Sequence, residues 1–532
     1  MSRSHTFRAL NAAAVARLAE LVAFTLRAGD AVTLSGELGA GKTTFARALI
    51  TALAHPAAVE VPSPTFTLVQ TYDTPRLSLA HFDLYRLTSP DELGELGLDD
   101  ALATGAALIE WPERAHARIG GTKLAISLTE SAGQPDARDV TLDPDGTWTG
   151  RLERLAAIRE FLEAAGYANA AIRYLQGDAS VRRYARLYCE HSATPMPMAP
   201  LVLMAPLVLM APLVLMDWPP QPDGPPIRNG LPYSRIAHLA EGVRPFVAIA
   251  DLLRSAGLSA PQIHAQDLNA GLLVLEDFGD RVFGVETKGA TPQAELWRAG
   301  VDTLVALRSS PPPPNLLPAY DAQALGIETE LLLDWYWPAL HGTPVPAATR
   351  AEYMALWAEI FAQLAVQPQG WALRDFHSPN LLWLPDRLAP RNVGLIDFQD
   401  AQVGPHAYDL VSLLQDARVD VSADLEAQLL AHYCARVAAL DPGFDRTAFV
   451  WSFAALGAQR NCKILGIFAR LAHRDGKPQY LAHIPRIWGY LARDLAHPGL
   501  ADLTSWFDRA FPQSLRIRLV SPTPAHPDRA PA

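Results

Sequence analysis

Two segments of this chain contain residues whose types and spacing suit chemistry on phosphate groups. The first is GELGAGKTT at residues 36–44. The second is LRDFHSPNLLWL at residues 373–384, which is followed by LIDF at residues 395–398. A glycine-rich loop that opens a helix and a catalytic loop with separate acid and amide groups are different designs for holding ATP. No single active site uses both, so the sequence predicts two enzymes in one chain.

The first segment fits the pattern G-x-x-x-x-G-K-[ST]. Its glycines allow backbone N–H groups to approach phosphate oxygens, while the lysine reaches the β- and γ-phosphates and the threonine hydroxyl binds Mg²⁺. An apolar strand before the loop and a helix after it provide the context that such a loop needs. We expect ATP to be bound by nine residues, among which Lys42 is also catalytic and Thr43 is a metal ligand: Gly36, Glu37, Leu38, Gly39, Ala40, Gly41, Lys42, Thr43 and Thr44.

An acidic residue that accompanies this loop is expected at the end of a strand. The run AALIE at residues 106–110 is apolar and ends in Glu110. Such a carboxylate holds Mg²⁺, directly or through water, or orients the attacking water in nucleotide hydrolysis. Glu110 is therefore a candidate metal ligand and catalytic residue. A carboxylate at the edge of a sheet, with no part in catalysis, is the alternative interpretation.

The second segment has the D-x-x-x-x-N spacing of a kinase catalytic loop, with Asp375 followed by Asn380. Asp397, in the apolar run VGLIDF, occupies the position of a metal-binding aspartate. Asp375 is expected to accept or orient the proton of the substrate hydroxyl, while Asn380 and Asp397 hold Mg²⁺ on the phosphates. The interval between Asn380 and Asp397 leaves room for two short strands and a turn. His377 is interpreted as a structural residue.

Two upstream segments are candidates to contact the nucleotide of the second site. QGDASVRRY at residues 176–184 resembles a hairpin that covers phosphates, and its candidate contacts are Ser180, Arg182 and Arg183. LVLEDFGD at residues 273–280 is expected to be a strand that enters a hinge, where the backbone near Glu276 and Phe278 binds adenine. The alternatives are solvated surface arginines for the first segment and an ordinary strand and turn for the second.

A repeated hexapeptide occupies the place of the third strand of this half. APLVLM occurs three times, beginning at residues 199, 205 and 211, and one copy is enough for a strand. A kinase needs a lysine on this strand to hold the α- and β-phosphates, but the last copy ends in Met216 and is followed by Asp217. Arg182 or Arg183 is a candidate replacement. The uncharged stretch 192–216 is long enough to span a bilayer, but its prolines would break a helix, so no membrane segment is expected.

Two kinds of fold must position these segments. Residues 1–150 alternate apolar strands with helices, which indicates α/β architecture with a mainly parallel sheet. The expected elements are helices at 12–26 and 42–53, strands at 31–36, 77–82, 106–110 and 123–128, and a closing hairpin within 131–148 that turns at Gln134–Pro135 and Asp145–Gly146.

The rest of the chain is expected to form a two-lobed, protein-kinase-like α+β domain. A helix from Arg151 to Ala165 leads into short strands, and long apolar-periodic segments predict helices toward the C-terminus. The predicted domains are a P-loop ATPase domain at 1–150, an N-lobe at 151–280, a helical C-lobe with the catalytic loop at 281–515, and a disordered tail at 516–532.

Composition limits the possible function classes. The net charge is −11 with no long basic run, which argues against nucleic acid bound through a basic face. The three cysteines are far apart and odd in number, which favours a reducing compartment. Arg17 and Glu20 interrupt the apolar stretch near the N-terminus, so an amphipathic helix is favoured over a signal peptide. A cytoplasmic protein is therefore expected.

Further motifs of the first half carry a family resemblance. SPTFT at 63–67, HFDLYRL at 81–87 and IEWPER at 109–114 follow the phosphate loop in order. Together they resemble the TsaE family of P-loop ATPases, which are needed for threonylcarbamoyladenosine formation on tRNA. The resemblance implies TsaB- and TsaD-like partners and only indirect contact with tRNA. It also implies that Asp83 lies near the metal and that Glu110 is the metal and hydrolysis acid.

The second half resembles aminoglycoside-phosphotransferase-like kinases over residues 155–510. More narrowly, RDFHSPNLLWL, IDFQDA and QRN-KILGIF-RL resemble the AmgK-type kinases, which phosphorylate N-acetylmuramate and N-acetylglucosamine. The resemblance implies ATP and Mg²⁺ as cofactors and a small amino-sugar substrate. It also implies that Asp409, in GPHAYDL, braces the catalytic loop.

A predicted helix near the C-terminus carries four basic residues with apolar residues between them: Arg460, Lys463, Arg470 and Arg474. One interpretation is an amphipathic helix with a basic solvent face. The other is a contact with an anionic substrate, such as the lactyl carboxylate of N-acetylmuramate.

The leading hypothesis is a bifunctional protein that combines an ATPase for tRNA modification with an amino-sugar kinase. A second hypothesis makes the kinase half a regulatory pseudokinase module. A third keeps an active kinase but changes its acceptor to an aminoglycoside, a choline-like molecule or another small alcohol.

Overall fold

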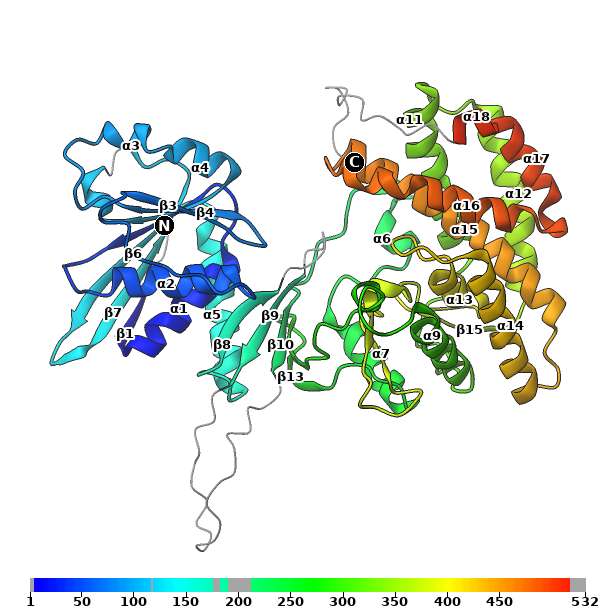
Figure 1. Ribbon diagram of the computed structural model, residues 1–532, viewed down its shortest axis with the longest axis horizontal. Helices are drawn as coiled ribbons and strands as arrows, with labels where there is room; N and C mark the ends of the chain where they lie inside the picture. Colours follow the sequence, from blue (N-terminus) through cyan, green and yellow to red (C-terminus); the bar gives the residue numbers. More distant parts are fainter. Residues whose placement is uncertain (1–3, 116–117, 176–181, 190–211, 517–532) are drawn as a thin grey trace, which may run out of the picture. The chain divides into compact units, whose positions relative to one another are not determined.

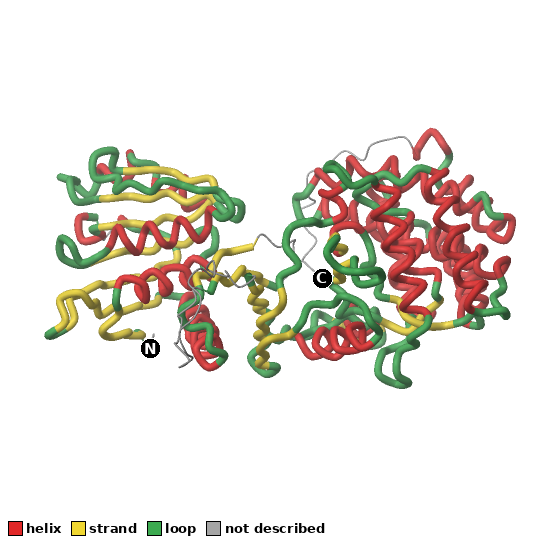
Figure 2. Tube along the Cα trace, turned by 60° about the horizontal axis from the view of Figure 1, so that its bottom comes forward, coloured by secondary structure: helices red, strands yellow, loops and turns green. Residues whose placement is uncertain are grey.

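The computed structural model describes residues 4–115, 118–175, 182–189 and 212–516. These residues form two compact units. Unit 1 takes its described residues from Met1–Pro219 and Ile263–Asp277, and unit 2 takes them from Pro220–Gln262 and Phe278–Ala532. Unit 1 contains two sheets, whereas helices dominate unit 2 (Figure 2).

The larger sheet of unit 1 has seven strands in the order β1-β7-β6-β2-β5-β4-β3. Neighbours β6, β2, β5 and β4 run parallel, whereas β1, β7 and β3 join antiparallel. The expected mainly parallel α/β architecture is therefore confirmed. The strands are β1 His5–Leu10, β2 Asp30–Ser35, β3 Val69–Asp73, β4 Ser78–Asp83, β5 Gly105–Glu110, β6 Thr122–Ser131 and β7 Gln134–Pro144.

Helices cover both faces of this sheet (Figure 1). One face packs against α1 Ala12–Thr25, α2 Lys42–Ala54 and α5 Trp148–Ala164, and the other packs against α3 Glu92–Glu95 and α4 Leu98–Thr104. Helix α1 begins where the Asn11 side chain accepts a hydrogen bond from Ala14 N at 2.9 Å. The expected amphipathic pattern is wrong for the second half of α1, because every residue from Leu18 to Thr25 is buried.

The predicted position of one turn is wrong. Gln134 and Pro135 do not turn the chain but begin β7. The hairpin between β6 and β7 turns instead at Ala132 and Gly133, where Gly133 has φ +75°. A tight hairpin favours positive φ, which glycine adopts without steric cost. The second predicted turn, at Asp145 and Gly146, follows the end of β7 as expected.

The smaller sheet of unit 1 is antiparallel, with the strand order β13-β14-β10-β9-β8. Its central strand, β10, consists of Leu213–Met216 from the third hexapeptide copy together with Asp217, so one copy does supply a strand. The two earlier copies lie outside the described residues. The strands are β8 Ala171–Leu175, β9 Arg183–Tyr188, β10 Leu213–Asp217, β13 Ile263–Asp267 and β14 Leu272–Glu276.

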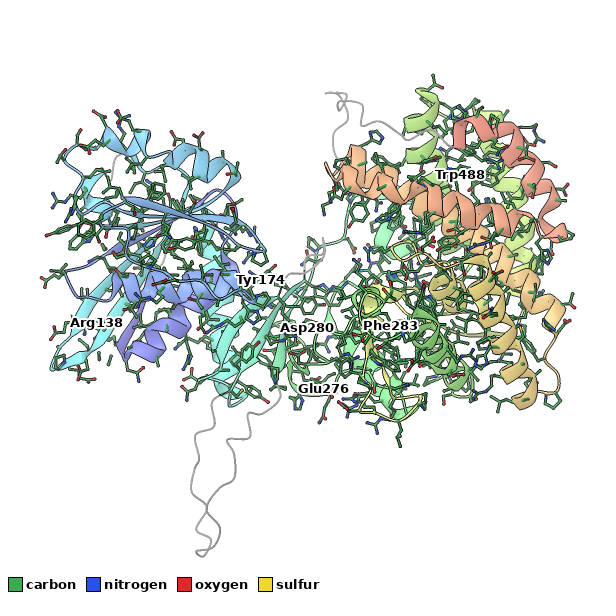
Figure 3. The ribbon with its side chains drawn as sticks, viewed as in Figure 1. Arg138, Tyr174, Glu276, Asp280, Phe283 and Trp488 are labelled. Atoms are coloured by element: carbon green, nitrogen blue, oxygen red, sulfur yellow. The ribbon has the colours of Figure 1, made fainter. Side chains whose placement is uncertain are left out.

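The two sheets of unit 1 share one hydrophobic core. Buried side chains of α1, α2 and α5 pack continuously with Ile172 of β8, Leu187 of β9 and Leu215 of β10. We call this cluster the shared core. It also includes buried side chains of the seven-stranded sheet. Tyr174 of β8, labelled in Figure 3, places its ring 6.2 Å from that of Phe24 in α1 and 4.7 Å from the guanidinium of Arg76.

Polar groups fix the contact at the edges of the shared core. Arg154 of α5 donates to Asp217 of β10 at 2.9 Å, and Arg183 of β9 forms a second ion pair with the same carboxylate. Tyr188 OH lies 3.1 Å from His55 Nε2. The shared core therefore contains residues from before and after residue 150, and it joins the first α/β fold to the five-stranded sheet.

Unit 2 is built mainly from helices. They are α6 Tyr233–Ile236, α7 Val243–Ser255, α8 Phe283–Glu286, α9 Gln293–Arg308, α10 Ala322–Leu331, α11 Trp337–His341, α12 Ala347–Ala365, α13 Ala407–Leu414, α14 Ala423–Leu440, α15 Arg446–His473, α16 Ile484–Leu495, α17 Ala501–Ala510 and α18 Gln513–Arg516. A π-helical segment, Leu332–Tyr336, links α10 to α11. Three two-stranded antiparallel sheets pair β11 Pro226–Arg228 with β12 Leu231–Pro232, β15 Gln369–Ala372 with β18 Gln402–Pro405, and β16 Leu381–Trp383 with β17 Val393–Leu395.

Candidate functional site

The phosphate loop connects β2 to α2, as predicted. Gly36 has φ +144°, and a Cβ atom there would lie 2.4 Å from the carbonyl oxygen of Leu128, so no larger residue fits without a shift. Gly41, with φ +103°, precedes the first residue of α2, Lys42. The backbone N–H groups at this helix start have no intrahelical partners, which makes the loop suitable for binding phosphate.

Lys42 lies inside the loop rather than in solvent. Its Nζ donates to the carbonyl oxygens of Gly36 at 2.7 Å and Glu37 at 2.9 Å, and it lies 3.6 Å from the ring centroid of Trp111. Burial lowers the pKa of Lys42, while the nearby carboxylates of Glu110, Glu113 and Asp83 oppose this effect. The ammonium group is thus held at the loop by carbonyls, a ring and acidic neighbours.

Two predicted metal ligands lie at the carboxyl ends of neighbouring strands, and the third, Thr43, lies in the first turn of α2. Asp83 of β4 and Glu110 of β5 are partners in register, and Thr43 Oγ1 donates to Glu110 Oε2 at 3.1 Å. A hydroxyl and two carboxylates are the oxygen ligands that Mg²⁺ prefers. Among the described residues, no group of three His, Cys, Asp or Glu side chains is placed to hold a metal alone. The residues present fit a Mg²⁺ ion whose remaining ligands are phosphate oxygens and water.

His81 is a part of this site that the sequence reading missed. Its Nε2 lies 3.0 Å from Glu110 Oε1, and both side chains are buried. The imidazole therefore orients the carboxylate whose other oxygen contacts Thr43. His81 precedes Asp83 by two residues, so both project from the same face of β4. That alternation was the signal that could have identified it.

Asp83 connects the strand ends to the SPTFT segment. Its Oδ2 accepts from Ser63 Oγ at 3.1 Å and from Thr65 Oγ1 at 2.7 Å, and its Oδ1 accepts from Tyr85 N at 3.0 Å. The segment that follows the phosphate loop in the sequence is thus tied directly to a candidate metal ligand.

The second site gathers the three residues that the D-x-x-x-x-N spacing and the VGLIDF run predicted. Asn380 Nδ2 donates to the carbonyl oxygen of Asp375 at 3.0 Å and lies 3.4 Å from Asp397 Oδ2. The two short strands expected between Asn380 and Asp397 are β16 and β17. Asp397 has φ +61°, a conformation that costs a non-glycine residue energy and that often occurs at functional sites.

Asp409 of α13 holds the catalytic loop through the backbone, in agreement with the expected brace. It accepts from Leu373 N at 2.6 Å and from Arg374 N at 2.9 Å. Burial raises the pKa of Asp409 to about 7. Asp416 accepts from Ser378 N at 2.7 Å, and burial lowers the pKa of His377 beside it. Both ends of the loop are therefore anchored to buried acids.

Arg374, which precedes Asp375, also ties the loop to the helices of unit 2. Its guanidinium donates to the carbonyl oxygen of Ala237 at 2.8 Å and forms a buried ion pair with Glu328 of α10. Lys463 of α15 donates to the same Glu328 carboxylate at 2.8 Å. The pKa of Glu328 is about 2, because these cations overcome the cost of its burial.

The expected basic solvent face of α15 is therefore wrong for two of its members. Lys463 is committed to Glu328, and the buried Arg460 donates to the carbonyl oxygen of Gln415 at 3.3 Å. A basic stripe in a sequence does not reveal that a buried acid lies opposite it.

The candidate nucleotide contacts of the second site are distributed over both units. Arg182 lies over the Trp218 ring at 4.9 Å, and Arg183 pairs with Asp217. Glu276 ends β14 in unit 1, whereas Phe278 belongs to unit 2. Ser180 lies outside the described residues. The assignment of these residues to ATP binding stays a prediction.

No helix within the described ranges is long and apolar enough to cross a bilayer. Residues 10–140 match the family model "Threonylcarbamoyl adenosine biosynthesis protein TsaE", and residues 171–450 match the model "Phosphotransferase enzyme family".

Individual proteins show the same division. The chain is 41% identical over 374 residues to an N-acetylmuramate/N-acetylglucosamine kinase of Caulobacter vibrioides, a match that covers 68% of this chain and 98% of that protein. It is 47% identical over 97 residues to a tRNA threonylcarbamoyladenosine biosynthesis protein TsaE of Rickettsia felis, covering 18% of this chain and 56% of that protein. The solved structure of the ADP-bound aminoglycoside phosphotransferase APH(2'')-Ib is 12% identical, with a TM-score of 0.38, over 64% of this chain and 98% of that one.

Proposed function

Because the chain belongs to the phosphotransferase enzyme family and carries a TsaE-type domain at residues 10–140, we propose that it is a bifunctional protein. Its second half transfers the γ-phosphate of ATP to a hydroxyl of N-acetylmuramate or N-acetylglucosamine. Its first half hydrolyses ATP in support of threonylcarbamoyladenosine formation on tRNA, together with TsaB- and TsaD-like proteins.

The observation that carries the kinase proposal is that Asp397 lies beside Asn380 of the braced loop that also carries Asp375. Asp375 orients the sugar hydroxyl and accepts its proton, while Asn380 and Asp397 supply the ligands for Mg²⁺. Bound Mg²⁺ neutralises charge on the phosphates. Asp409 and the Glu328–Arg374 pair keep the loop in place during the transfer.

In the first half, the phosphate loop binds ATP, and the acids at the ends of β4 and β5 bind the metal. Thr43, Asp83 and Glu110 supply oxygen ligands for Mg²⁺, and Lys42 neutralises the phosphates. His81 holds Glu110 in the orientation in which one oxygen is available beside Thr43.

A regulatory pseudokinase is the second candidate for the second half, and one observation favours it. The third strand offers Asp217 where a kinase carries a cation, and Arg154 and Arg183 neutralise that acid. In this case the cation that would bind the α- and β-phosphates is absent from the third strand, and a structural ion pair stands in its place.

The test compares the full-length wild type with Lys42→Ala, Asp375→Ala and the exposed control Asp386→Ala. Each protein is given ATP with N-acetylmuramate, N-acetylglucosamine, an aminoglycoside or choline, and sugar phosphate is measured by mass spectrometry. We expect Asp375→Ala to abolish sugar phosphorylation, and Lys42→Ala and Asp386→Ala to retain it. Loss in Lys42→Ala would contradict two independent sites, and an inactive wild type would favour the pseudokinase.

The first half is tested with its partners present. The four proteins are added to TsaB- and TsaD-like proteins, tRNA, ATP and the threonylcarbamoyl donor, and modified adenosine is quantified. We expect the modification to be lost in Lys42→Ala and kept in Asp375→Ala. The opposite pattern would remove the first half from this reaction.

A further inference from the structure

The four basic residues of α15 have unequal surroundings. Arg460, Lys463, Arg470 and Arg474 are spaced by three, seven and four residues, so they project from one face of the helix. Lys463 pairs with Glu328, Arg460 donates to Gln415 O, and Arg474 donates to Asp475 at 2.6 Å. Each of these three cations has an acceptor in the protein.

Arg470 differs from the other three. Its side chain is half-buried, its Nε is buried without a hydrogen-bond partner, and no ion pair joins it to another described residue. Burial and the neighbouring Arg474 lower the pKa of Arg470, while Asp475, already held by Arg474, opposes them. Burying a cation without a partner is unfavourable. The site therefore has an unmet preference for an anion.

The position of Arg470 relates it to the catalytic loop. Tyr233 of α6 lies within electrostatic range of Arg470 and also of Arg374, Lys463 and Glu328. Arg374 immediately precedes Asp375, and its guanidinium contacts the same Glu328 as Lys463 does. Arg470 follows Lys463 by two turns on the same helix face. Arg470 and Tyr233 thus belong to the same group of charged and phenolic side chains as Arg374, the residue next to Asp375.

We propose that Arg470, assisted by the hydroxyl of Tyr233, binds the carboxylate of an acidic amino sugar. This proposal rests on the proposed function and names the substrate class of its kinase site. N-acetylmuramate carries a lactyl carboxylate that N-acetylglucosamine lacks. A planar guanidinium binds a carboxylate through two parallel hydrogen bonds, which an ammonium group cannot reproduce. Burial keeps the pKa of Tyr233 raised, so its hydroxyl remains a donor.

The consequence is a division of labour on α15. Lys463 and Arg460 hold the protein together, whereas Arg470 distinguishes substrates and contributes little to the phosphoryl transfer itself. Arg470 is a specificity residue, because the hydroxyl that reacts is common to both sugars.

The test measures steady-state kinetics of the full-length wild type, Arg470→Gln, Arg470→Lys and the control Arg509→Gln, an exposed arginine of α17, with both sugars. For Arg470→Gln we expect kcat/KM for N-acetylmuramate to fall about 10- to 100-fold, mainly through KM, because a charge-assisted contact is lost. The value for N-acetylglucosamine should stay within about twofold, since no carboxylate contacts Arg470. Arg470→Lys should give an intermediate loss, and Arg509→Gln should keep the wild-type ratio of the two sugars.

Stability provides the second readout. Because no ion pair joins Arg470 to a described residue, the thermal midpoint of Arg470→Gln should equal or exceed that of the wild type. An unchanged ratio of kcat/KM for the two sugars in Arg470→Gln would overturn the proposal, whether or not the thermal midpoint falls. If the wild type phosphorylates neither sugar, the proposed function itself fails. A wild type active on N-acetylglucosamine alone refutes only the role of Arg470.

Discussion

Glu20 of α1 forms an ion pair with Arg173 of β8, and its second carboxylate oxygen accepts a hydrogen bond from Ile172 N at 2.8 Å. Glu20 is buried, so an acid of the first α/β fold satisfies two groups of the five-stranded sheet that follows it. This contact lies within the shared core. It makes the two sheets of unit 1 dependent on each other.

Replacing Glu20 with alanine should loosen β8. The Ile172 N–H would lose its partner and Arg173 its counter-ion, which we expect to destabilise the contact by about 3 kcal/mol. Amide hydrogen exchange in Ala171–Leu175, measured by mass spectrometry, should accelerate about 100-fold if local opening controls it. Glu163→Ala, an exposed acid on α5, is the matched control and should leave this peptide unchanged. Wild-type protection in Glu20→Ala would show that the contact contributes nothing.

The substitution Glu110→Gln, compared with Glu113→Gln, should distinguish the loss of a metal ligand from the loss of a negative charge near Lys42. It keeps the shape of the side chain but weakens a metal ligand, so we expect ATP hydrolysis by the first half to fall by about 100-fold or more. Phosphate release is measured in the Asp375→Ala background with the TsaB- and TsaD-like partners. Glu113 is an exposed acid that also raises the pKa of Lys42, so Glu113→Gln controls for the field at the lysine. Equal losses in both variants would argue against a ligand role for Glu110.

Asp409 should make the stability of unit 2 depend on pH. Its pKa of about 7 in the folded protein lies above the ordinary value of 3.8, so folding favours the protonated form. The stabilisation is complete below about pH 4 and is lost as the pH rises through about 7. Asp409→Asn cannot ionise, although its amide leaves one of the two backbone N–H donors without an acceptor.

The measurement is chemical unfolding at pH 5 and pH 8. Between these values the wild type should lose up to about 3 kcal/mol more than Asp409→Asn does. A parallel pH dependence in the two proteins would show that the carboxyl is already ionised at pH 5. The comparison cancels the other buried acids, which are identical in both proteins.

Gly466 of α15 should not tolerate a side chain. A Cβ atom there would lie 2.3 Å from the backbone carbonyl of Leu331, so the helix would have to move away from the end of α10. We expect Gly466→Ala to destabilise unit 2 by about 1–3 kcal/mol. Gly489 of α16 has nothing within 4 Å of its Cβ position, so Gly489→Ala should stabilise it by about 0.5–1 kcal/mol. Thermal midpoints that shift in the same direction would contradict this close packing.

The sequence predicted those parts of the sites that depend on local pattern. The strand, loop and helix around Lys42 follow from an apolar run, two glycines and helical periodicity, all within a short stretch. The Asp375-to-Asn380 spacing is equally local, and the matched families confirm the two expected resemblances. Pairing of β4 with β5 then brings Asp83 beside Glu110.

Contacts between distant residues were not predictable. Glu20 looked like an interruption of an apolar stretch, because its partners lie 152 and 153 residues away. Lys463 looked solvated for the same reason, since Glu328 is 135 residues before it. The role of His81 depends on Glu110 of the neighbouring strand, so it could not be inferred from the sequence around His81 alone. In each case a charged or polar side chain was interpreted without the group that satisfies it.

The shared core also sets an order of events during synthesis. The seven-stranded sheet is complete once residue 144 has left the ribosome, and its last helix, α5, is complete at Ala164. The strands that pack on α1 come later. Until β8 emerges, the Glu20 carboxylate and the apolar side chains beside it are open to water. The first fold then acts as a template on which β8, β9 and β10 dock in turn. A nascent chain that stalls between Ala164 and Ala171 would expose the apolar surface of α1. A ribosome pause there would therefore favour aggregation and misfolding.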